Sequence, residues 1–290
     1  MSHSSLSQLQ RPAFAVVNGE LVAYDDVKVH ISAEALTRAL SVFEGMKGYW
    51  DLESREFGFG TRASITGAWC RSAALLHIPV DFSYNEYRDS CLDLARALLT
   101  VERDMWFRAT MYVVDGHWGE GTRADLLVTA FHQTKDLIPP MTLTVSSWRR
   151  SGDTQLPDRA KAAANYVVAR QARIEASGRG FDDAVLLNDA GRVAEATGSC
   201  VVALRDGVVL TPPPYEGALE SITLASSSAS ATVTDSPSSD ARWIGQSSSR
   251  ATRRRWPARS LNSRRSLRSI PPGCVSTELS SPSARAISVR

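Results

Sequence analysis

The sequence predicts an α+β fold in two domains, followed by a C-terminal tail of different character. Segments with strand and helix patterns alternate in two groups, and Gln133–Pro140, which ends in two prolines, lies between the groups as an interdomain linker. From residue 225 onward serine and arginine dominate, and no helical or strand period persists, so we expect a disordered, basic tail. We expect the functional site between the two domains. The predicted boundaries are 1–12 for a flexible N-terminus, 13–132 for a small α/β domain, 133–140 for the linker, 141–224 for a larger domain and 225–290 for the tail.

The first domain is expected to open with a β-hairpin. Ala13–Val17 and Glu20–Tyr24 flank the dipeptide Asn18-Gly19, which supplies the two positive φ angles of a type I′ turn. Further strands are predicted at Ser41–Trp50, Met105–Val114 and Asp125–Phe131. In the first of these strands, Gly45 and Gly48 allow another group to approach the backbone closely.

Two helices are expected within this domain. Arg62–His77 has apolar residues at helical spacing and stops before Pro79. The second helix begins after Ser83, because Glu86 three residues later completes a capping box. Its apolar face is predicted to carry Tyr87, Cys91, Leu94 and Leu98.

The second domain is expected to open with a strand over Met141–Trp148. An amphipathic helix follows Lys161 and ends at Gly178, and its pattern includes Val167, Val168 and Ile174. Buried strands are predicted at Ala184–Leu187 and Val201–Leu204, and a further hairpin over Arg205–Leu210.

Composition excludes several classes of protein. The chain has 290 residues with 43% hydrophobic content, which is ordinary for a globular protein, and no run of eighteen apolar residues that could span a membrane. Met1–Gln10 lacks the apolar segment of a secretory signal. The four cysteines fit no metal or disulfide spacing, so we expect no metal site and a reduced, cytoplasmic location. They are Cys70, Cys91, Cys200 and Cys274.

The net charge of +2 hides an asymmetry between the two parts of the chain. Residues 225–290 hold 11 arginines, no lysine and three acidic residues, a balance of +8, so the first 224 residues carry −6. A difference of this size indicates that the tail and the preceding chain obey different compositional rules.

A single lysine, Lys161, lies among alanines in the segment Asp158–Tyr166. From composition alone, an ordinary lysine in an alanine-rich loop is the simpler interpretation, because few lysines are buried. The functional interpretation is a partly desolvated amine with a lowered pKa that forms a Schiff base with an aldehyde.

The segment Ala160–Tyr166 resembles the pyridoxal-phosphate lysine segment of the fold-type IV (class IV) aminotransferases, the branched-chain amino acid aminotransferase group. Other blocks of that family match in the same order over about residues 14 to 224. They are Ser41–Gly45, Arg62, Phe107-Arg108, Ser146–Arg149, Glu195–Ser199 and Leu219–Thr223. The resemblance implies the two-domain architecture of D-amino-acid aminotransferase, with residues 141–224 as an incomplete cofactor-binding domain.

The resemblance implies pyridoxal 5'-phosphate (PLP) as the cofactor, bound as a Schiff base to Lys161, which then moves the proton between substrate and cofactor. Tyr166 would hydrogen-bond the phenolic oxygen of PLP, and Glu195 would keep its pyridine nitrogen protonated. Without the resemblance, Tyr166 is equally well a core aromatic residue, and a lone glutamate in a turn is usually solvated. The other implied cofactor contacts are the phosphate-binding Arg62, the supporting Thr197 and Gly198, and an anion site at Ile222 and Thr223.

The implied reaction transfers an amino group between a branched-chain L-amino acid and 2-oxoglutarate. Arg108 resembles the arginine that meets the distal carboxylate of 2-oxoglutarate, and a structural ion pair is the alternative. Phe43, Tyr49 and Trp106 are expected to line an apolar pocket, although aromatic residues in strands are more often core. Arg38 stands where other members have tyrosine. The resemblance also implies a homodimer.

The resemblance ends near Leu224. Family members continue with a helix, two strands and a Gly-Thr-Ala-Ala-Glu segment, and none of these appears in residues 225–290. One hypothesis is a frameshift, because a shifted frame over Trp256–Ile270 with GC-rich codons can encode a similar Gly-Thr segment; sequencing the gene tests it. Losing these strands would impair folding and cofactor retention.

Two other functions stay open. A fold-type IV lyase, such as one acting on aminodeoxychorismate, shares these blocks, although Arg108 favours the aminotransferase. An inactive remnant whose basic tail binds a polyanion is a different class of function, since eleven arginines could give a salt-dependent affinity. The tail has no nucleic-acid motif, so we expect small-molecule amino and 2-oxo acids as partners rather than nucleic acid or a membrane.

Overall fold

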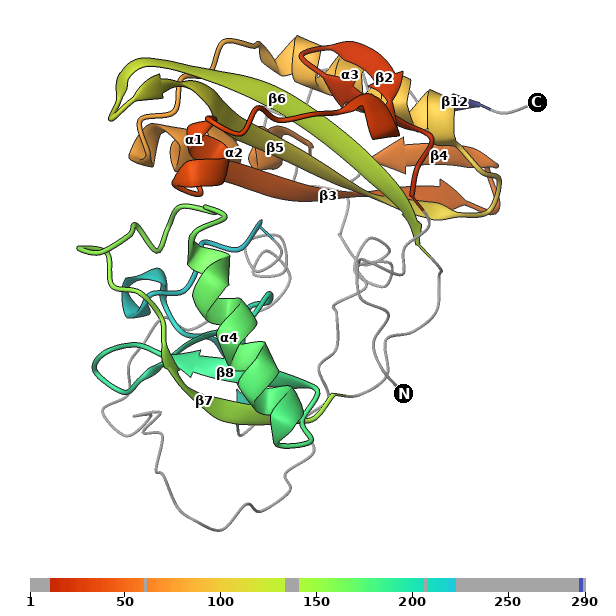
Figure 1. Cartoon of the computed structure of the whole chain (residues 1–290). Coiled ribbons are helices and arrows are strands. Elements are labelled where there is room, and N and C mark those ends of the chain that lie inside the picture. Colours follow the sequence, from red (N-terminus) through yellow and green to blue (C-terminus); the bar gives the residue numbers. More distant parts are fainter. Residues whose placement is uncertain (1–10, 60–61, 134–140, 206–207, 223–286, 289–290) are drawn as a thin grey trace, which may run out of the picture. The chain divides into compact units, whose positions relative to one another are not determined.

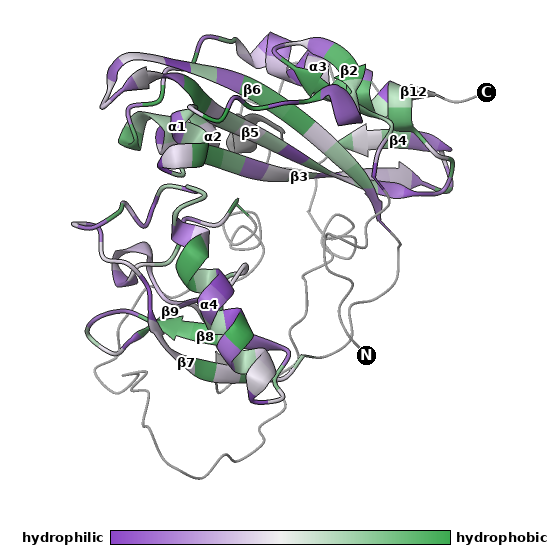
Figure 2. Ribbon diagram, viewed as in Figure 1, coloured by the Kyte–Doolittle hydropathy of each residue, from purple (hydrophilic) through white to green (hydrophobic). Residues whose placement is uncertain are grey.

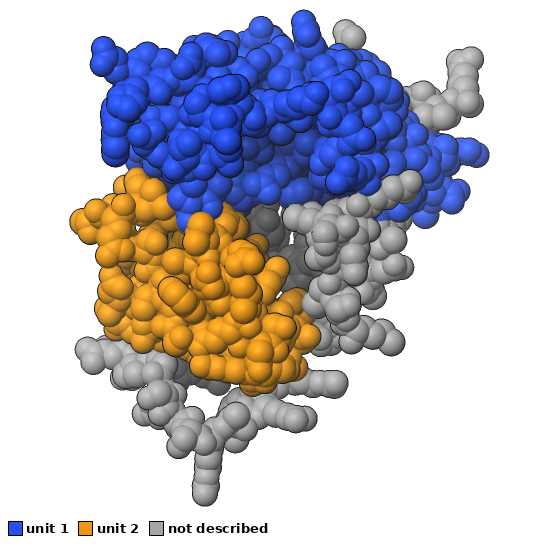
Figure 3. Space-filling model, in the orientation of Figure 1, with its two compact units in different colours: residues 1–136, 160–164, 282–290 blue, residues 137–159, 165–281 orange. Residues whose placement is uncertain are grey.

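The computed structural model describes residues 11–59, 62–133, 141–205, 208–222 and 287–288. By contacts the chain divides into two compact units (Figure 3). Unit 1 comprises residues 1–136, 160–164 and 282–290, and unit 2 comprises residues 137–159 and 165–281. The segment Ala160–Ala164 thus belongs by its contacts to unit 1, although it lies in the chain between two parts of unit 2. The domain boundaries expected from the sequence stay a prediction.

In the described part of unit 1, seven strands form one antiparallel sheet in the order β12-β4-β3-β5-β6-β1-β2 (Figure 1). Their bounds are β1 Phe14–Val17, β2 Glu20–Ala23, β3 Ser41–Asp51, β4 Glu56–Phe59, β5 Asp104–His117, β6 Glu120–Gln133 and β12 Ile287–Ser288. The helices of this unit are α1 Glu34–Thr37, α2 Arg62–Leu75 and α3 Tyr84–Leu98, with a 3₁₀ turn η2 at Tyr24–Asp26.

Local signals in the sequence predicted several of these elements correctly. Asn18 and Gly19 have φ of 48° and 87°, and β1 and β2 pair across them as the hairpin required. The capping box of α3 is complete, because Ser83 and Glu86 each accept a hydrogen bond from the other's backbone N–H. Strand β4 and helix α1 were missed, since both span only four residues.

One face of the sheet carries the core of unit 1. Strand β5 alternates, and Met105, Phe107 and Met111 are at most 1% exposed on this face. Helix α2 contacts β3, helix α3 contacts β1 and β6, and the rings of Trp69 and Tyr87 meet between the two helices at 5.4 Å. Trp69, Tyr87, Cys91 and Leu94 are therefore buried as predicted, whereas Leu98 at the end of α3 is only half-buried.

Close approach at two glycines of β3 was also predicted correctly. A Cβ atom on Gly48 would lie 2.1 Å from the Phe57 ring of the neighbouring strand, and one on Gly45 would lie 3.1 Å from Trp106 Nε1. Both aromatic rings therefore pack on space that only glycine leaves.

Unit 2 contains a three-stranded sheet in the order β7-β8-β9 and a separate β10-β11 hairpin. Strands β7 and β8 are parallel and are joined through helix α4, which packs on both (Figure 1). The bounds are β7 Leu143–Arg149, α4 Asn165–Gly178, β8 Asp183–Leu187, β9 Val193–Ala196, β10 Ala203–Arg205 and β11 Val208–Leu210, with a 3₁₀ turn η3 at Pro214–Glu216.

The core of unit 2 is made largely of alanine. Ala169, Ala172 and Ala176 of α4 pack on Ala184 and Leu186 of β8, a strand coloured hydrophobic in Figure 2. Small side chains let the helix approach the sheet closely. The helix was predicted correctly, and Val168 of its predicted pattern packs against this core.

Two residues that were predicted for the apolar face of α4 are exposed instead. Val167 and Ile174 are 57% and 51% exposed, while the alanines between them are buried. A further correction concerns Val201–Leu204: Val202 is 39% exposed, and the strand begins only at Ala203. None of the described helices is long and apolar enough to cross a membrane. Apart from Ile287–Ser288, the predictions for the tail lie outside the described residues.

Candidate active site

Strand β3 fixes the backbone on both sides of Lys161. The N–H of Phe43 donates to the carbonyl of Lys161 at 3.0 Å, and the N–H of Ala163 donates to the carbonyl of Ser41 at 2.9 Å. The N–H of Lys161 itself donates to Ser72 Oγ of α2 at 3.0 Å. Three hydrogen bonds within four residues therefore set the direction in which the lysine side chain leaves the backbone.

The Lys161 side chain is half-buried beside an aromatic ring. Its Nζ lies 5.5 Å from the ring centroid of Phe43, and the Arg108 guanidinium carbon lies 3.8 Å from the same centroid. Phe43 is 8% exposed, so its ring gives both cations an apolar, partly desolvated contact. Phe43 and Arg108, which were predicted to bind substrate, therefore lie beside the predicted catalytic lysine.

Buried Glu44 adds a negative charge near this lysine. The residue is 9% exposed, and its burial raises the pKa of the carboxyl, while Lys161, the N–H of Gly45 and Arg71 oppose that rise. Sequence reasoning gave Glu44 no role. A charged residue in the apolar run of Ser41–Gly45 was the signal that could have identified it.

In unit 2, the Glu195 carboxylate is held at both oxygens. Oε1 lies 3.2 Å from an Nη atom of Arg150, and Oε2 accepts a hydrogen bond from the N–H of Leu219 at 3.0 Å. Glu195 lies in β9 opposite Leu186 of β8, and its side chain is 14% exposed. Glu195 is therefore largely enclosed, unlike the solvated glutamate that was the alternative to its predicted cofactor role.

Arg150 also pairs with Asp158, and both side chains are buried. Arg150 Nε lies 3.7 Å from Asp158 Oδ1, and the guanidinium donates to the carbonyls of Gly217 and Asp158 at 3.1 and 3.2 Å. Burial raises the pKa of Asp158 to about 6; Arg150 opposes this rise, and the nearby acids Asp153, Glu195 and Asp189 add to it. Neither Arg150 nor Asp158 was identified from the sequence, because buried charges leave no periodic pattern.

Of three further predicted residues of unit 2, Tyr166 and Thr197 make contacts within the unit and Gly198 is exposed. Tyr166 is half-buried and packs against the alanine core, which agrees with the core alternative for its ring. Thr197 is 6% exposed, and its hydroxyl donates to Asp183, whereas Gly198 beside it is exposed. The structure thus gives Thr197 a supporting role within unit 2.

The phosphate residues are only partly described. Arg62 begins α2, but its side chain is not among the described groups, and Thr223 lies outside the described residues. Ile222 is half-buried. Tyr49 is half-buried in β3, with Lys47 Nζ 5.1 Å from its ring centroid. No predicted phosphate contact can therefore be drawn from side-chain geometry.

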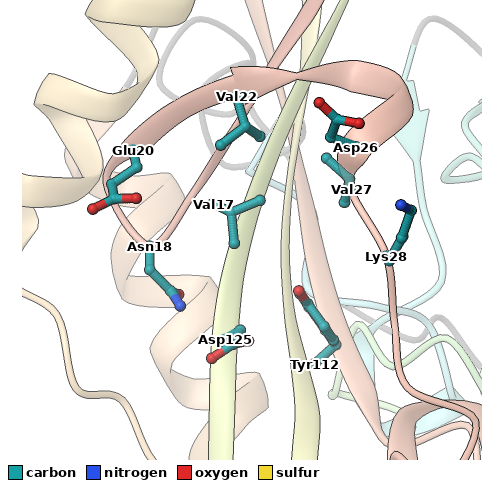
Figure 4. Close-up of a pocket in the computed structure, with 9 residues that line it drawn as sticks. All are labelled: Val17, Asn18, Glu20, Val22, Asp26, Val27, Lys28, Tyr112 and Asp125. Carbon is teal, nitrogen blue, oxygen red and sulfur yellow. The ribbon is translucent and has the colours of Figure 1, made fainter.

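A hollow of about 440 Å³ lies elsewhere in unit 1 (Figure 4). Nine residues line it: Val17, Asn18, Glu20, Val22, Asp26, Val27, Lys28, Tyr112 and Asp125. Burial, with the adjacent Asp125, raises the pKa of Tyr112. None of the residues predicted for catalysis lines this hollow, so it is separate from the surroundings of Lys161.

Comparison with known families gives a match over more than half of the chain. The family described as "Amino-transferase class IV" matches residues 69–236. Among curated relatives, the branched-chain-amino-acid aminotransferase of Escherichia coli is 30% identical over 215 residues, which cover 71% of this chain and 68% of the relative.

Solved structures agree with this match. The branched-chain aminotransferase of Thermoproteus uzoniensis, solved with norvaline, is 28% identical with a TM-score of 0.71, and the match covers 76% of this chain and 75% of that one. The branched-chain amino acid aminotransferase of Thermobaculum terrenum in its PLP-form is 29% identical with a TM-score of 0.68, covering 74% and 72%. The mixed α/β fold of this chain is therefore shared with these enzymes.

Proposed function

Because this chain belongs to the class IV aminotransferase family, we propose that it uses PLP to transfer an amino group between a branched-chain L-amino acid and 2-oxoglutarate. The observation that carries this proposal is the surroundings of Lys161. Its amine lies beside Phe43 and Arg108, and its backbone is fixed by three hydrogen bonds to β3 and α2. A fixed, half-buried amine is what attachment of an aldehyde cofactor requires.

The residues present fit PLP. When bound, PLP withdraws electrons from the substrate carbon, provided that its ring nitrogen is protonated. Glu195 would accept that proton's hydrogen bond, since a carboxylate has about four acceptor positions and Arg150 and Leu219 hold this one in place. Ala160 and Ala162 are at most 1% exposed and flank Lys161 with side chains too small to obstruct a flat ring.

Lys161 would perform two steps in this proposal. Its amine would hold PLP covalently and, once released, would move the proton to and from the substrate α-carbon. Phe43 presents its ring to the amine and covers one side of it. Tyr166, Arg62, Thr197, Gly198, Ile222 and Thr223 would hold the remaining groups of PLP, as the family resemblance implies.

Arg108 would select the dicarboxylate. Its guanidinium is stacked on Phe43 and can pair with the distal carboxylate of 2-oxoglutarate or glutamate. In Arg108→Met, we expect KM for 2-oxoglutarate to rise about tenfold or more, while the reaction with leucine alone changes little. Equal losses in both half-reactions would argue that Arg108 serves the fold instead. Phe43 and Tyr49 would line the side of the site that takes the branched side chain.

The test is to determine which lysine forms the adduct with PLP. The chain has four, at positions 28, 47, 135 and 161, so borohydride reduction with excess PLP followed by peptide mass spectrometry has few sites to separate. We expect one stable adduct on Lys161, none in Lys161→Ala, and an unchanged adduct in Lys47→Arg. Adduct spread over all lysines, or its persistence in Lys161→Ala, would contradict the proposal.

The altered C-terminus is expected to weaken retention of PLP rather than attachment. Gel filtration without free PLP would then remove the cofactor from unreduced protein, although reduction in excess PLP still labels Lys161. A protein that stays loaded through gel filtration would contradict this impairment. We further propose a homodimer, for which sedimentation is the direct measurement; a cytoplasmic location stays a prediction.

A further inference from the structure

We propose that Arg150 is a positioning residue that keeps the Glu195 carboxylate ionised and oriented for the protonated ring nitrogen of PLP. This inference rests on the proposed function, because Glu195 would need such positioning only if the cofactor is PLP, with its protonated ring nitrogen. It concerns four groups of unit 2 that lie together: Arg150, Asp158, Glu195 and the backbone of Gly217–Leu219.

The sheet register brings Arg150 and Glu195 together. Arg150 follows the last residue of β7, and its N–H donates to the carbonyl of Leu187 in β8 at 2.9 Å. Glu195 pairs with the adjacent Leu186 from the other side of β8. The central strand therefore sets the separation of the two side chains, so their pairing follows from backbone structure.

Arg150 is held too firmly to act as a mobile surface charge. Its side chain is 5% exposed, Nε donates to the Gly217 carbonyl at 3.1 Å, and an Nη atom donates to the Asp158 carbonyl at 3.2 Å. Two backbone acceptors fix the plane of the guanidinium, and the same Nη atom then lies 3.2 Å from Glu195 Oε1. A planar, always-charged group in a fixed position can orient a carboxylate as well as attract it.

The turn that supplies one of these acceptors is itself constrained. Gly217 has φ of 88°, and a Cβ atom there would lie 3.0 Å from Asp158 Oδ2. Two residues later, Leu219 donates its N–H to Glu195 Oε2. The same short turn therefore holds the arginine from one side and the glutamate from the other.

Asp158 shares the positive charge of Arg150 with Glu195. One arginine faces two acids, and among the described groups Asp158 Oδ1 has no hydrogen-bond partner, only the ion pair at 3.7 Å. Burial raises the pKa of Asp158 to about 6, with Asp153 and Asp189 also contributing, so Asp158 takes up a proton in mild acid. The Arg150 charge then remains to pair with Glu195.

The test is a pH titration of the Glu195 carboxyl by ¹³C NMR in the full chain without cofactor, with the signal assigned through Glu195→Gln. In Arg150→Met, we expect the titration midpoint of Glu195 to rise by about one pH unit or more, a tenfold change in proton affinity. Arg150→Lys should recover part of the shift, because it restores charge but not the planar fork. Arg173→Met is the matched control, since Arg173 also pairs with an acid of unit 2, Asp183, but is 58% exposed.

Should Arg150→Met fail to fold, Arg150→Gln keeps a donor for the Gly217 carbonyl and removes the charge together with the Nη contacts. An unchanged Glu195 midpoint in a folded Arg150 variant, or an equal shift in Arg173→Met, overturns the proposal. A second measurement is the ¹⁵N shift of labelled PLP in excess: Arg150→Met should move the ring nitrogen toward its neutral value. If the Glu195 midpoint shifts but the ring nitrogen of PLP does not respond, Arg150 has no positioning role toward PLP. Failure of the proposed function itself would be recognised separately, by the absence of a PLP adduct on Lys161.

Discussion

The two units are built from cores of opposite kind. In unit 1, Trp50, Trp69 and Tyr87 are at most 2% exposed and bury large aromatic surfaces against the sheet. In the described part of unit 2, Ala169, Ala172, Ala176, Ala184 and Leu186 form the core. Because an alanine buries little apolar area, unit 2 gains less hydrophobic free energy per residue and depends more on close backbone packing and on its buried ion pairs. Unit 1 should therefore be sensitive to lost volume, and unit 2 to added volume and to charge.

The largest effect is expected where unit 1 loses volume. Trp69 is fully buried, contacts the rings of Phe82 and Tyr87, and donates its indole N–H to the Val42 carbonyl at 3.4 Å. Trp69→Ala should lower the free energy of unfolding by about 3–5 kcal/mol. Urea denaturation combined with hydrogen exchange would measure this loss and locate it in unit 1.

Trp118→Ala is the control, because this residue is 77% exposed and should change the free energy of unfolding by less than about 0.5 kcal/mol. Comparable losses of unfolding free energy for the two tryptophans would show that the aromatic core is not the main source of stability in unit 1.

The second effect tests the buried charge of unit 2. The pKa of Asp158 is raised from 3.8 to about 6, so the folded state holds the proton more tightly than the unfolded state. The stabilising contribution of this proton is complete below about pH 4 and is lost as pH rises through 6, a difference of up to about 3 kcal/mol. Asp158→Asn should flatten the pH dependence of Tm between pH 4 and 7 and raise Tm at neutral pH.

The control is Asp81→Asn, since Asp81 is an exposed aspartate of unit 1 and should leave the pH profile of Tm nearly unchanged. If both variants give the same profile, the burial of Asp158 is not what makes unit 2 sensitive to pH.

The smallest effect comes from added volume in the alanine core. Ala172 is fully buried between α4 and the sheet, so Ala172→Leu should destabilise unit 2 by about 1–3 kcal/mol through overpacking. Ala74→Leu in α2 makes the same change at an exposed helical position and should be nearly neutral. Thermal unfolding of both variants measures the difference; a neutral Ala172→Leu would mean that unit 2 is loosely packed.

Short-range signals made much of the fold predictable. The hairpin at Asn18-Gly19 and the capping box at Ser83 depend on neighbouring residues only, so the sequence contains what is needed to predict them. The buried face of α4 was predicted only in part: Val168 packs against the core, but Val167 and Ile174 are exposed, because close helix–sheet packing favours alanine at the innermost positions.

The candidate site was predictable only in part. Lys161 and Glu195 were identified from family motifs, since a lone lysine or glutamate carries no local signal. Glu44, Arg150 and Asp158 were not assigned roles, because their burial results from contacts between residues far apart in the chain. The pairing of Lys161 with β3 depends on sequence separations of more than a hundred residues, which no periodicity encodes.

That pairing limits how this gene can be divided. The chain leaves unit 2 after Arg159, contributes Ala160–Ala164 to the edge of unit 1, and re-enters unit 2 at Asn165. A fragment ending at residue 136 would lack the lysine, and a fragment starting at residue 137 would lack the strand that orients it. Recombination with a relative is therefore expected to preserve function only when β3 and the lysine segment are inherited from the same parent.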